Sequence, residues 1–203
     1  MDSKQEPTMI VTADEVHRSV RGAIELLNRR VEGLKAFDMS ETGFWRSFAA
    51  IWLTLPAYVV SLAFERLRIG LPPDGNLLDH VGLDLAVAFA HVASFVALPV
   101  AMIWIVRRIG LTSRYVPFVI VTNWITVLSL IVLSLPGFLL VTGMATAQLA
   151  GFFTLAFAIV IVRLQWFATI VTLGVSGGLA AGIVGLGIGL NFGIGTLLHA
   201  AIG

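Results

Sequence analysis

Residues 174–193 read GVSGGLAAGIVGLGIGLNFG, and glycines recur every three or four positions in this otherwise apolar stretch. That spacing places glycines on one side of a helix, where a second helix can approach almost to backbone contact. In water each glycine would cost about 1 kcal/mol relative to alanine, whereas in lipid the backbone must satisfy its own hydrogen bonds and helix is favoured. We therefore expect a membrane helix that packs through a glycine stripe: Gly174, Gly178, Gly182, Gly185, Gly189 and Gly193.

Composition places the whole chain in the same class. Of its 203 residues, 58% are hydrophobic and 12% are charged, and the mean hydropathy is +0.94. Soluble domains are about a quarter charged. No acidic residue follows Asp84, and no cysteine is present, which excludes disulfides, thiolate metal sites and cysteine nucleophiles. The composition predicts a polytopic integral membrane protein.

The amino-terminal segment, residues 1–43, is polar and charged and has no signal-peptide core, so the first span is expected to act as an uncleaved signal. Thr12 and Glu15 have the spacing of a capping box. A stripe of apolar residues then predicts an amphipathic cytoplasmic helix of about 22 residues: Val16, Val20, Ile24, Leu27, Val31 and Leu34. This helix can lie on an anionic lipid surface, dock on its own chain, or pair with a partner helix.

Residues 44–203 predict a bundle of about five transmembrane helices, so the fold class is all-α. We expect spans at 44–64 with a kink at Pro56, at 81–106 with a bend at Pro99, and at 115–135, before Pro136. Residues 137–203 cannot be one helix, because residues 148–190 alone would reach about 65 Å. A break at residues 163–166, which include the charged Arg163, therefore separates two further spans, at 146–162 and 167–187. Residues 185–202 either extend the last span or fold back as a re-entrant segment. Leu173 is expected to face lipid.

Basic residues are distributed unequally between the two ends of these spans. The amino-terminal segment, the loop at residues 107–114 and Arg163 fall on one side, whereas Arg66 and Arg68 fall on the other. The positive-inside rule then predicts a cytoplasmic amino terminus and an outside carboxyl terminus.

Few polar residues lie within the spans. Asp84 and His91, seven residues apart, share one helix face about 10 Å apart in depth, and Asn123 lies in the third span. One interpretation is a proton or cation path. The favoured interpretation is structural, with Asp84 near the outer interface, where water is available, and His91 neutral and bonded to Asn123 or a serine.

Catalytic and cofactor sites are not predicted. His17 lies in the cytoplasmic helix, whereas His80 and His199 lie near the outer ends of the spans, which disfavours a haem held by two facing histidines. No motif indicates a metal, a phosphate loop or a serine hydrolase. We expect no catalytic residue, no metal, no cofactor and no nucleic-acid partner. Pore lining by the glycines remains an alternative to helix packing.

The span pattern from Phe44 onward, with Pro56 in the first span, resembles that of Yip1-type membrane proteins. The acidic-aromatic-glycine-proline signature of that family is replaced here by Asp38-Met39-Ser40-Glu41. The resemblance implies a membrane-organising or partner-binding role without catalysis. Residues 41–46 are also similar to uncharacterised bacterial inner-membrane proteins, which implies that location.

The expected function is therefore a non-enzymatic scaffold, accessory or assembly subunit. Its partners would be the lipid bilayer and either a second protein or another copy of the chain, bound through the glycine stripe or the amphipathic helix. The alternative is a small transporter or channel that uses Asp84, His91 and Asn123.

Overall fold

The computed structural model describes residues 10–74 and 80–202, and this part of the chain is helical, with no strand. It contains five helices long and apolar enough to cross a membrane, as predicted. The expected polar tail at residues 1–8 and part of the loop after the first span lie outside the described residues. The elements are α1 (Ala13–Leu27), η1 (Val31–Ala36), α2 (Glu41–Ala49), η2 (Ala50–Thr54), α3 (Leu55–Arg68), α4 (Val81–Arg108), η3 (Thr112–Arg114), α5 (Tyr115–Val141), α6 (Ala147–Leu173) and α7 (Gly177–Ile202).

The amphipathic helix is shorter than expected. The Thr12 hydroxyl caps it by accepting from the Glu15 amide, as predicted, but α1 ends at Leu27. The backbone then reverses through Arg29, at φ 60°, and returns as the 3₁₀ turn η1. The two pieces touch at glycines, because a Cβ on Gly22 would lie 2.8 Å from the Gly33 carbonyl oxygen. We call this unit, residues 13–36, the amino-terminal hairpin.

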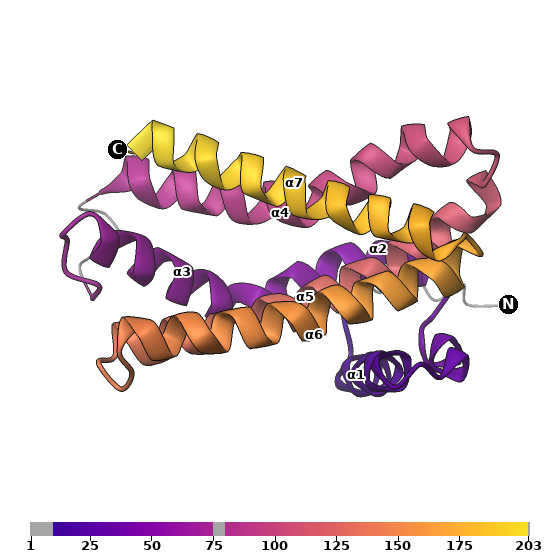
Figure 1. Ribbon diagram of the computed structural model, residues 1–203, viewed down its shortest axis with the longest axis horizontal. Coiled ribbons are helices and arrows are strands. Elements are labelled where there is room, and N and C mark those ends of the chain that lie inside the picture. Colours follow the sequence, from indigo (N-terminus) through magenta and orange to yellow (C-terminus); the bar gives the residue numbers. More distant parts are fainter. Residues whose placement is uncertain (1–9, 75–79, 203) are drawn as a thin grey trace, which may run out of the picture.

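The amino-terminal hairpin packs on α5 and α6, and its Ala23 and Leu26 belong to the main core. Figure 1 shows α1 end-on, whereas the long helices run along the molecule, so α1 lies across the bundle near one end. Of the three placements considered for the amphipathic helix, the structure therefore has it docked on its own chain. The docked face differs from the predicted stripe, because Glu15 and Ser19 are buried whereas Ile24 is more than half exposed.

The first span is a single path through the membrane, from Glu41 to Arg68, made of three pieces. Ser40 caps α2 by accepting from the Gly43 amide. The 3₁₀ turn η2 then separates α2 from α3, and Pro56 lies in the first turn of α3. The interruption falls beside the proline, where the sequence predicted a kink, because proline fits the first turn of a helix better than its interior.

Helix α5 forms the centre of the bundle, packing against α2, α3, α4 and α6. Its residues Phe118–Val121 are almost completely buried. The predicted stop before Pro136 is wrong, since α5 continues to Val141, and the turn that follows contains Gly143 at φ 73°. A proline inside a transmembrane helix is tolerated when neighbouring groups satisfy the freed carbonyl.

The predicted break at residues 163–166 is also wrong. Helix α6 runs without interruption from Ala147 to Leu173, so Arg163 lies within it. The chain turns instead at Gly174, which caps α6 in the left-handed region at φ 68°, and α7 extends from Gly177 to Ile202. Residues 185–202 therefore extend the last span. Leu173, which was expected to face lipid, is 1% exposed.

Helices α6 and α7 diverge from their shared turn at the right of Figure 1. Helix α6 follows α5, whereas α7 lies beside α4. The last two spans are the least buried of the five, so much of their surface faces outward.

Candidate functional site

Asp84, the first candidate polar residue, is buried and paired with a charge that the sequence analysis had not selected. Arg66 Nη2 lies 2.9 and 3.1 Å from the two carboxylate oxygens of Asp84, and Arg66 is only 2% exposed. The expectation that Asp84 is solvated is therefore wrong. A signal for this pair was present, because consecutive antiparallel spans place residues that end one helix and begin the next at similar depth.

His91 also bonds to the first span. Its Nε2 lies 2.7 Å from the Thr54 hydroxyl, which itself donates to the Ile51 carbonyl at 2.6 Å. Because a hydroxyl has one proton to donate, this arrangement assigns the Nε2–H tautomer, with His91 as the donor to Thr54. The expected partner, Asn123 or a serine, is thus replaced by a threonine. The Tyr58 ring lies edge-on to His91, with centroids 5.7 Å apart.

Tyr58 lies between the two polar groups of α4. Its hydroxyl donates weakly to the main-chain carbonyl of Asp84 at 3.4 Å, while its ring contacts His91. Among the described residues, no hydrogen bond joins the Asp84 carboxylate to His91. The contacts hold α3 and η2 against α4.

Asn123 belongs to a different contact. Its Nδ2 donates to the Ser47 hydroxyl at 3.0 Å, and Ser47 donates to the Phe44 carbonyl at 2.7 Å. Asn123 is fully buried between α5 and α2, with no hydrogen-bond partner for Oδ1 in the described part of the chain. The three candidate residues therefore occupy two separate places. All of them bond to side chains of the first span.

The glycine stripe does not pack against another helix of this chain. A Cβ built on Gly178, Gly182, Gly185, Gly189 or Gly193 would have no neighbour within 4 Å among the atoms compared. Gly174 is the cap of α6 and lies outside α7. Helix α7 instead approaches α4 at Gly187, where a Cβ would lie 3.2 Å from Leu98. Among the described residues no helix covers the stripe, which is an open face, and Gly185 borders a groove between α6 and α7.

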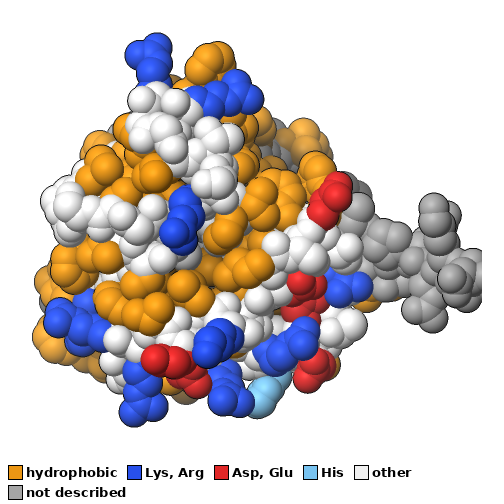
Figure 2. Space-filling model, turned by 90° about the vertical axis from the view of Figure 1, so that its right-hand side faces the viewer, with side chains coloured by type: hydrophobic (Ala, Val, Ile, Leu, Met, Phe, Trp, Pro, Cys, Tyr) orange, Lys and Arg blue, Asp and Glu red, His pale blue; other side chains and the backbone are white. Residues whose placement is uncertain are grey.

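The end of the molecule that carries the amino-terminal hairpin is basic. Figure 2 looks onto this end and shows Lys and Arg side chains spread over it, with fewer acidic ones. The loop between α4 and α5 contributes Arg107, Arg108 and Arg114, which are all exposed.

Glu15 does not complete the predicted capping box, because its carboxylate does not bond to the Thr12 amide, and it occupies a position that the sequence did not indicate. Its side chain is buried under α1, it is 3% exposed, and both carboxylate oxygens lack a hydrogen bond in the described residues. Arg46 Nη1 lies 3.8 Å away. Burial raises the pKa of Glu15, and the opposing effect of the Arg46 charge does not fully offset it.

Together these features define the class: an all-helical integral membrane protein with five spans, internally paired polar groups and an open glycine face. Comparisons with models of protein families, with curated proteins and with solved structures found no match.

Proposed function

We propose that this chain is a non-enzymatic scaffold or accessory subunit of a membrane assembly, and that a partner helix packs on the glycine stripe of α7. The observation that carries the proposal is the open stripe itself. From Gly178 to Gly193 it runs about 22 Å along the helix axis. Close packing of small residues is a principal way in which helices associate in lipid.

The polar groups inside the membrane support the same proposal. Asp84 is neutralised by Arg66, and His91 is held by Thr54. A transporter that moved a cation through these residues would have to break contacts that fix the first span to α4. Breaking a buried ion pair costs about 3–5 kcal/mol. Their arrangement therefore favours a structural role over the alternative of a transporter.

We further propose that the hairpin end is cytoplasmic, that the carboxyl terminus lies outside, and that the membrane is a bacterial inner membrane. The support for the orientation is the excess of basic residues at the hairpin end. The proposed location rests on the resemblance of residues 41–46 to uncharacterised bacterial inner-membrane proteins. The partner on α7 would then be another membrane protein or a second copy of the chain.

Association can be tested through Gly182, which lies near the middle of the stripe. Since the chain has no cysteine, Gly182→Cys introduces a single thiol for crosslinking in a mild detergent or a nanodisc. We expect either a crosslinked homodimer or a stoichiometric protein partner. Gly182→Leu should weaken that association at least tenfold, because a larger side chain separates the helix backbones.

The matched control is Gly151→Leu, since Gly151 also lies inside a helix with open space around it, but on α6. This variant should associate normally. A monomer without a partner, or equal association of both leucine variants, would contradict the assembly proposal. Uptake by proteoliposomes that is abolished in folded His91→Ala protein would instead favour the transporter.

A further inference from the structure

A cavity of about 250 Å³ lies between α4, α5, α6 and α7. It reaches Gly187 and Asn191 on α7, about 15 and 21 Å along the helix from its start at the hairpin end. The cavity is thus near the middle of the spans. No charged residue lines it, and neutral polar side chains from all four helices do: Ser94, Thr122, Thr126, Ser129, Gln165 and Asn191.

These polar side chains have unused hydrogen-bonding capacity. Ser129 donates to the Ile125 carbonyl, and Asn191 Nδ2 donates to the Gly187 carbonyl, so the Ser129 hydroxyl oxygen and Asn191 Oδ1 remain as acceptors. Within the described chain, Thr126 and the Gln165 amide form no side-chain hydrogen bond. Polar groups in apolar surroundings are costly without partners. The cavity therefore suits a molecule that both donates and accepts hydrogen bonds.

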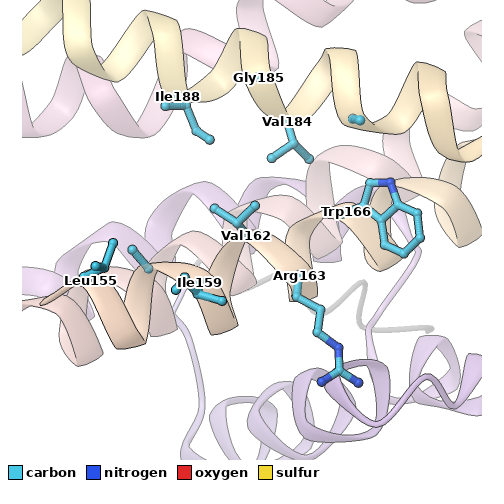
Figure 3. A pocket seen from close by; sticks show the side chains of 10 residues that line it. Leu155, Ile159, Val162, Arg163, Trp166, Val184, Gly185 and Ile188 are labelled. Carbon is cyan, nitrogen blue, oxygen red and sulfur yellow. The ribbon is translucent and has the colours of Figure 1, made fainter. Parts of the chain in front are cut away.

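A wider apolar groove lies next to this cavity. The groove has a volume of about 600 Å³ and lies between α6 and α7, where the two helices diverge (Figure 3). Ala158, Val162 and Ile188 line both the groove and the cavity, so the two spaces are neighbours. Arg163 also borders the groove, but Figure 3 shows its guanidinium pointing away from α7 toward the amino-terminal hairpin.

We propose that the groove and the cavity together bind a single-chain lipid with an uncharged, hydroxyl-bearing head, of the monoacylglycerol type. The chain lies in the groove between α6 and α7, and the head occupies the cavity. An uncharged head is required, because no charged residue lines the cavity to compensate the burial of an ionic one. A hydroxyl fits because it can donate to Asn191 Oδ1 and accept from a threonine hydroxyl or the Gln165 amide.

The test uses the full chain in phosphatidylcholine nanodiscs that contain a small fraction of photoactivatable monooleoylglycerol. After illumination, mass spectrometry locates the labelled residues. We expect labels to concentrate on the groove-lining residues of α6 and α7, and unlabelled monooleoylglycerol to compete. Oleate, which is charged at pH 8, should compete at least tenfold less well. Equal competition by oleate would overturn the assignment of an uncharged head.

Two variants remove polar groups from the cavity with little change of shape, Thr126→Val and Gln165→Leu. Each should weaken labelling by photoactivatable monooleoylglycerol by about fivefold, the effect of losing one hydrogen bond of about 1 kcal/mol. The matched control is Thr154→Val, because Thr154 lies on α6 outside this cavity. Ala158→Phe should reduce groove labelling by filling the junction between the two spaces.

Circular dichroism and thermal unfolding would verify that each variant is folded. Uniform labelling over all outward-facing helices would overturn the proposal, as would labelling that none of the folded cavity variants changes. Those results would mean that the cavity holds water only, since a space of this size accommodates several molecules at about 30 Å³ each. Gly185 borders the groove as well as belonging to the stripe, so the separating variant is Gly193→Leu, which changes the stripe outside the groove and should leave lipid labelling unchanged.

Discussion

Arg66 and Asp84 lie on neighbouring helices, with 2.9 Å between Arg66 Nη2 and Asp84 Oδ1, and both are buried. Arg66→Met leaves the carboxylate without its charge partner, so we expect a loss of about 3–5 kcal/mol in stability. The double variant Arg66→Met/Asp84→Leu removes both charges and should recover most of that loss. Unfolding in detergent, followed by circular dichroism, measures both. If Arg66→Met were as stable as the wild-type protein, the ion pair would not contribute to stability.

Glu15 adds a pH-dependent contact. Its carboxylate faces Arg46 of α2, with Asp38 and Arg18 also contributing to its local field, and burial raises its pKa above the usual 4.5. The docked hairpin therefore binds a proton more tightly than the undocked one. Docking is strongest below pH 4.5 and weakens as the pH rises through the raised pKa.

Amide hydrogen exchange of α1, corrected for intrinsic rates, measures this dependence. Wild-type α1 should be more protected at pH 5 than at pH 8, whereas Glu15→Gln should be well protected at both. At pH 8 Glu15→Gln should be better protected than the wild-type protein, because the neutral amide avoids burying a charge. Glu32→Gln, at an exposed position on η1, is the control and should retain the wild-type dependence. An unchanged dependence in Glu15→Gln would exclude this carboxylate as the cause.

At the scale of elements, apolar length and composition were sufficient to predict five spans, because a helix satisfies the polar backbone groups of an apolar segment within lipid. They were insufficient to place the boundaries within residues 137–203. Because the segment was too long for one helix, a break was predicted at its charged residue, Arg163, yet a long arginine side chain can reach toward the hairpin end from within a helix. Gly174 was assigned to the glycine stripe because of its spacing, but in the structure it ends α6 and begins the turn to α7.

The candidate polar site was predicted only in part, for a related reason. Spacing along one helix placed Asp84 and His91 on a common face, but their partners Arg66 and Thr54 come from another span. The register between the first span and α4 depends on the 3₁₀ turn η2, which no periodicity in the sequence indicated. The rotation of α7 about its own axis, which turns the stripe outward, likewise depends on packing at Gly187.

The turn between α6 and α7 yields a prediction at this scale. Gly174 has φ 68°, where a Cβ is strained, so Gly174→Ala should destabilise the protein by about 1–2 kcal/mol. Gly174→Asn should be closer to the wild-type protein, because asparagine tolerates this conformation. Gly151→Ala, inside α6, should instead stabilise by up to about 1 kcal/mol. Thermal unfolding of the three variants checks the signs, and a neutral Gly174→Ala would contradict the argument.

For the whole molecule, an odd number of spans requires the two termini to lie on opposite sides of the membrane. Ten of the Lys and Arg residues in the described part belong to the hairpin end: Arg18, Arg21, Arg29, Arg30, Lys35, Arg46, Arg107, Arg108, Arg114 and Arg163. Arg66 and Arg68 belong to the other end. Since short basic loops are retained in the cytoplasm, this imbalance favours a single orientation.

We therefore expect a reporter that is active only outside the cytoplasm to be active when fused after Gly203, and a cytoplasmic reporter to be active in the loop at Gly110. Replacing Arg107, Arg108 and Arg114 by asparagine removes part of the positive charge at the hairpin end. The preference for one orientation should then weaken, so that a measurable fraction of the chains inserts in the opposite sense. The matched change at the other end, Arg68→Asn, should leave the orientation unchanged. Cytoplasmic activity of a fusion after Gly203, together with outside activity at Gly110, would mean that the bundle inserts in the opposite sense.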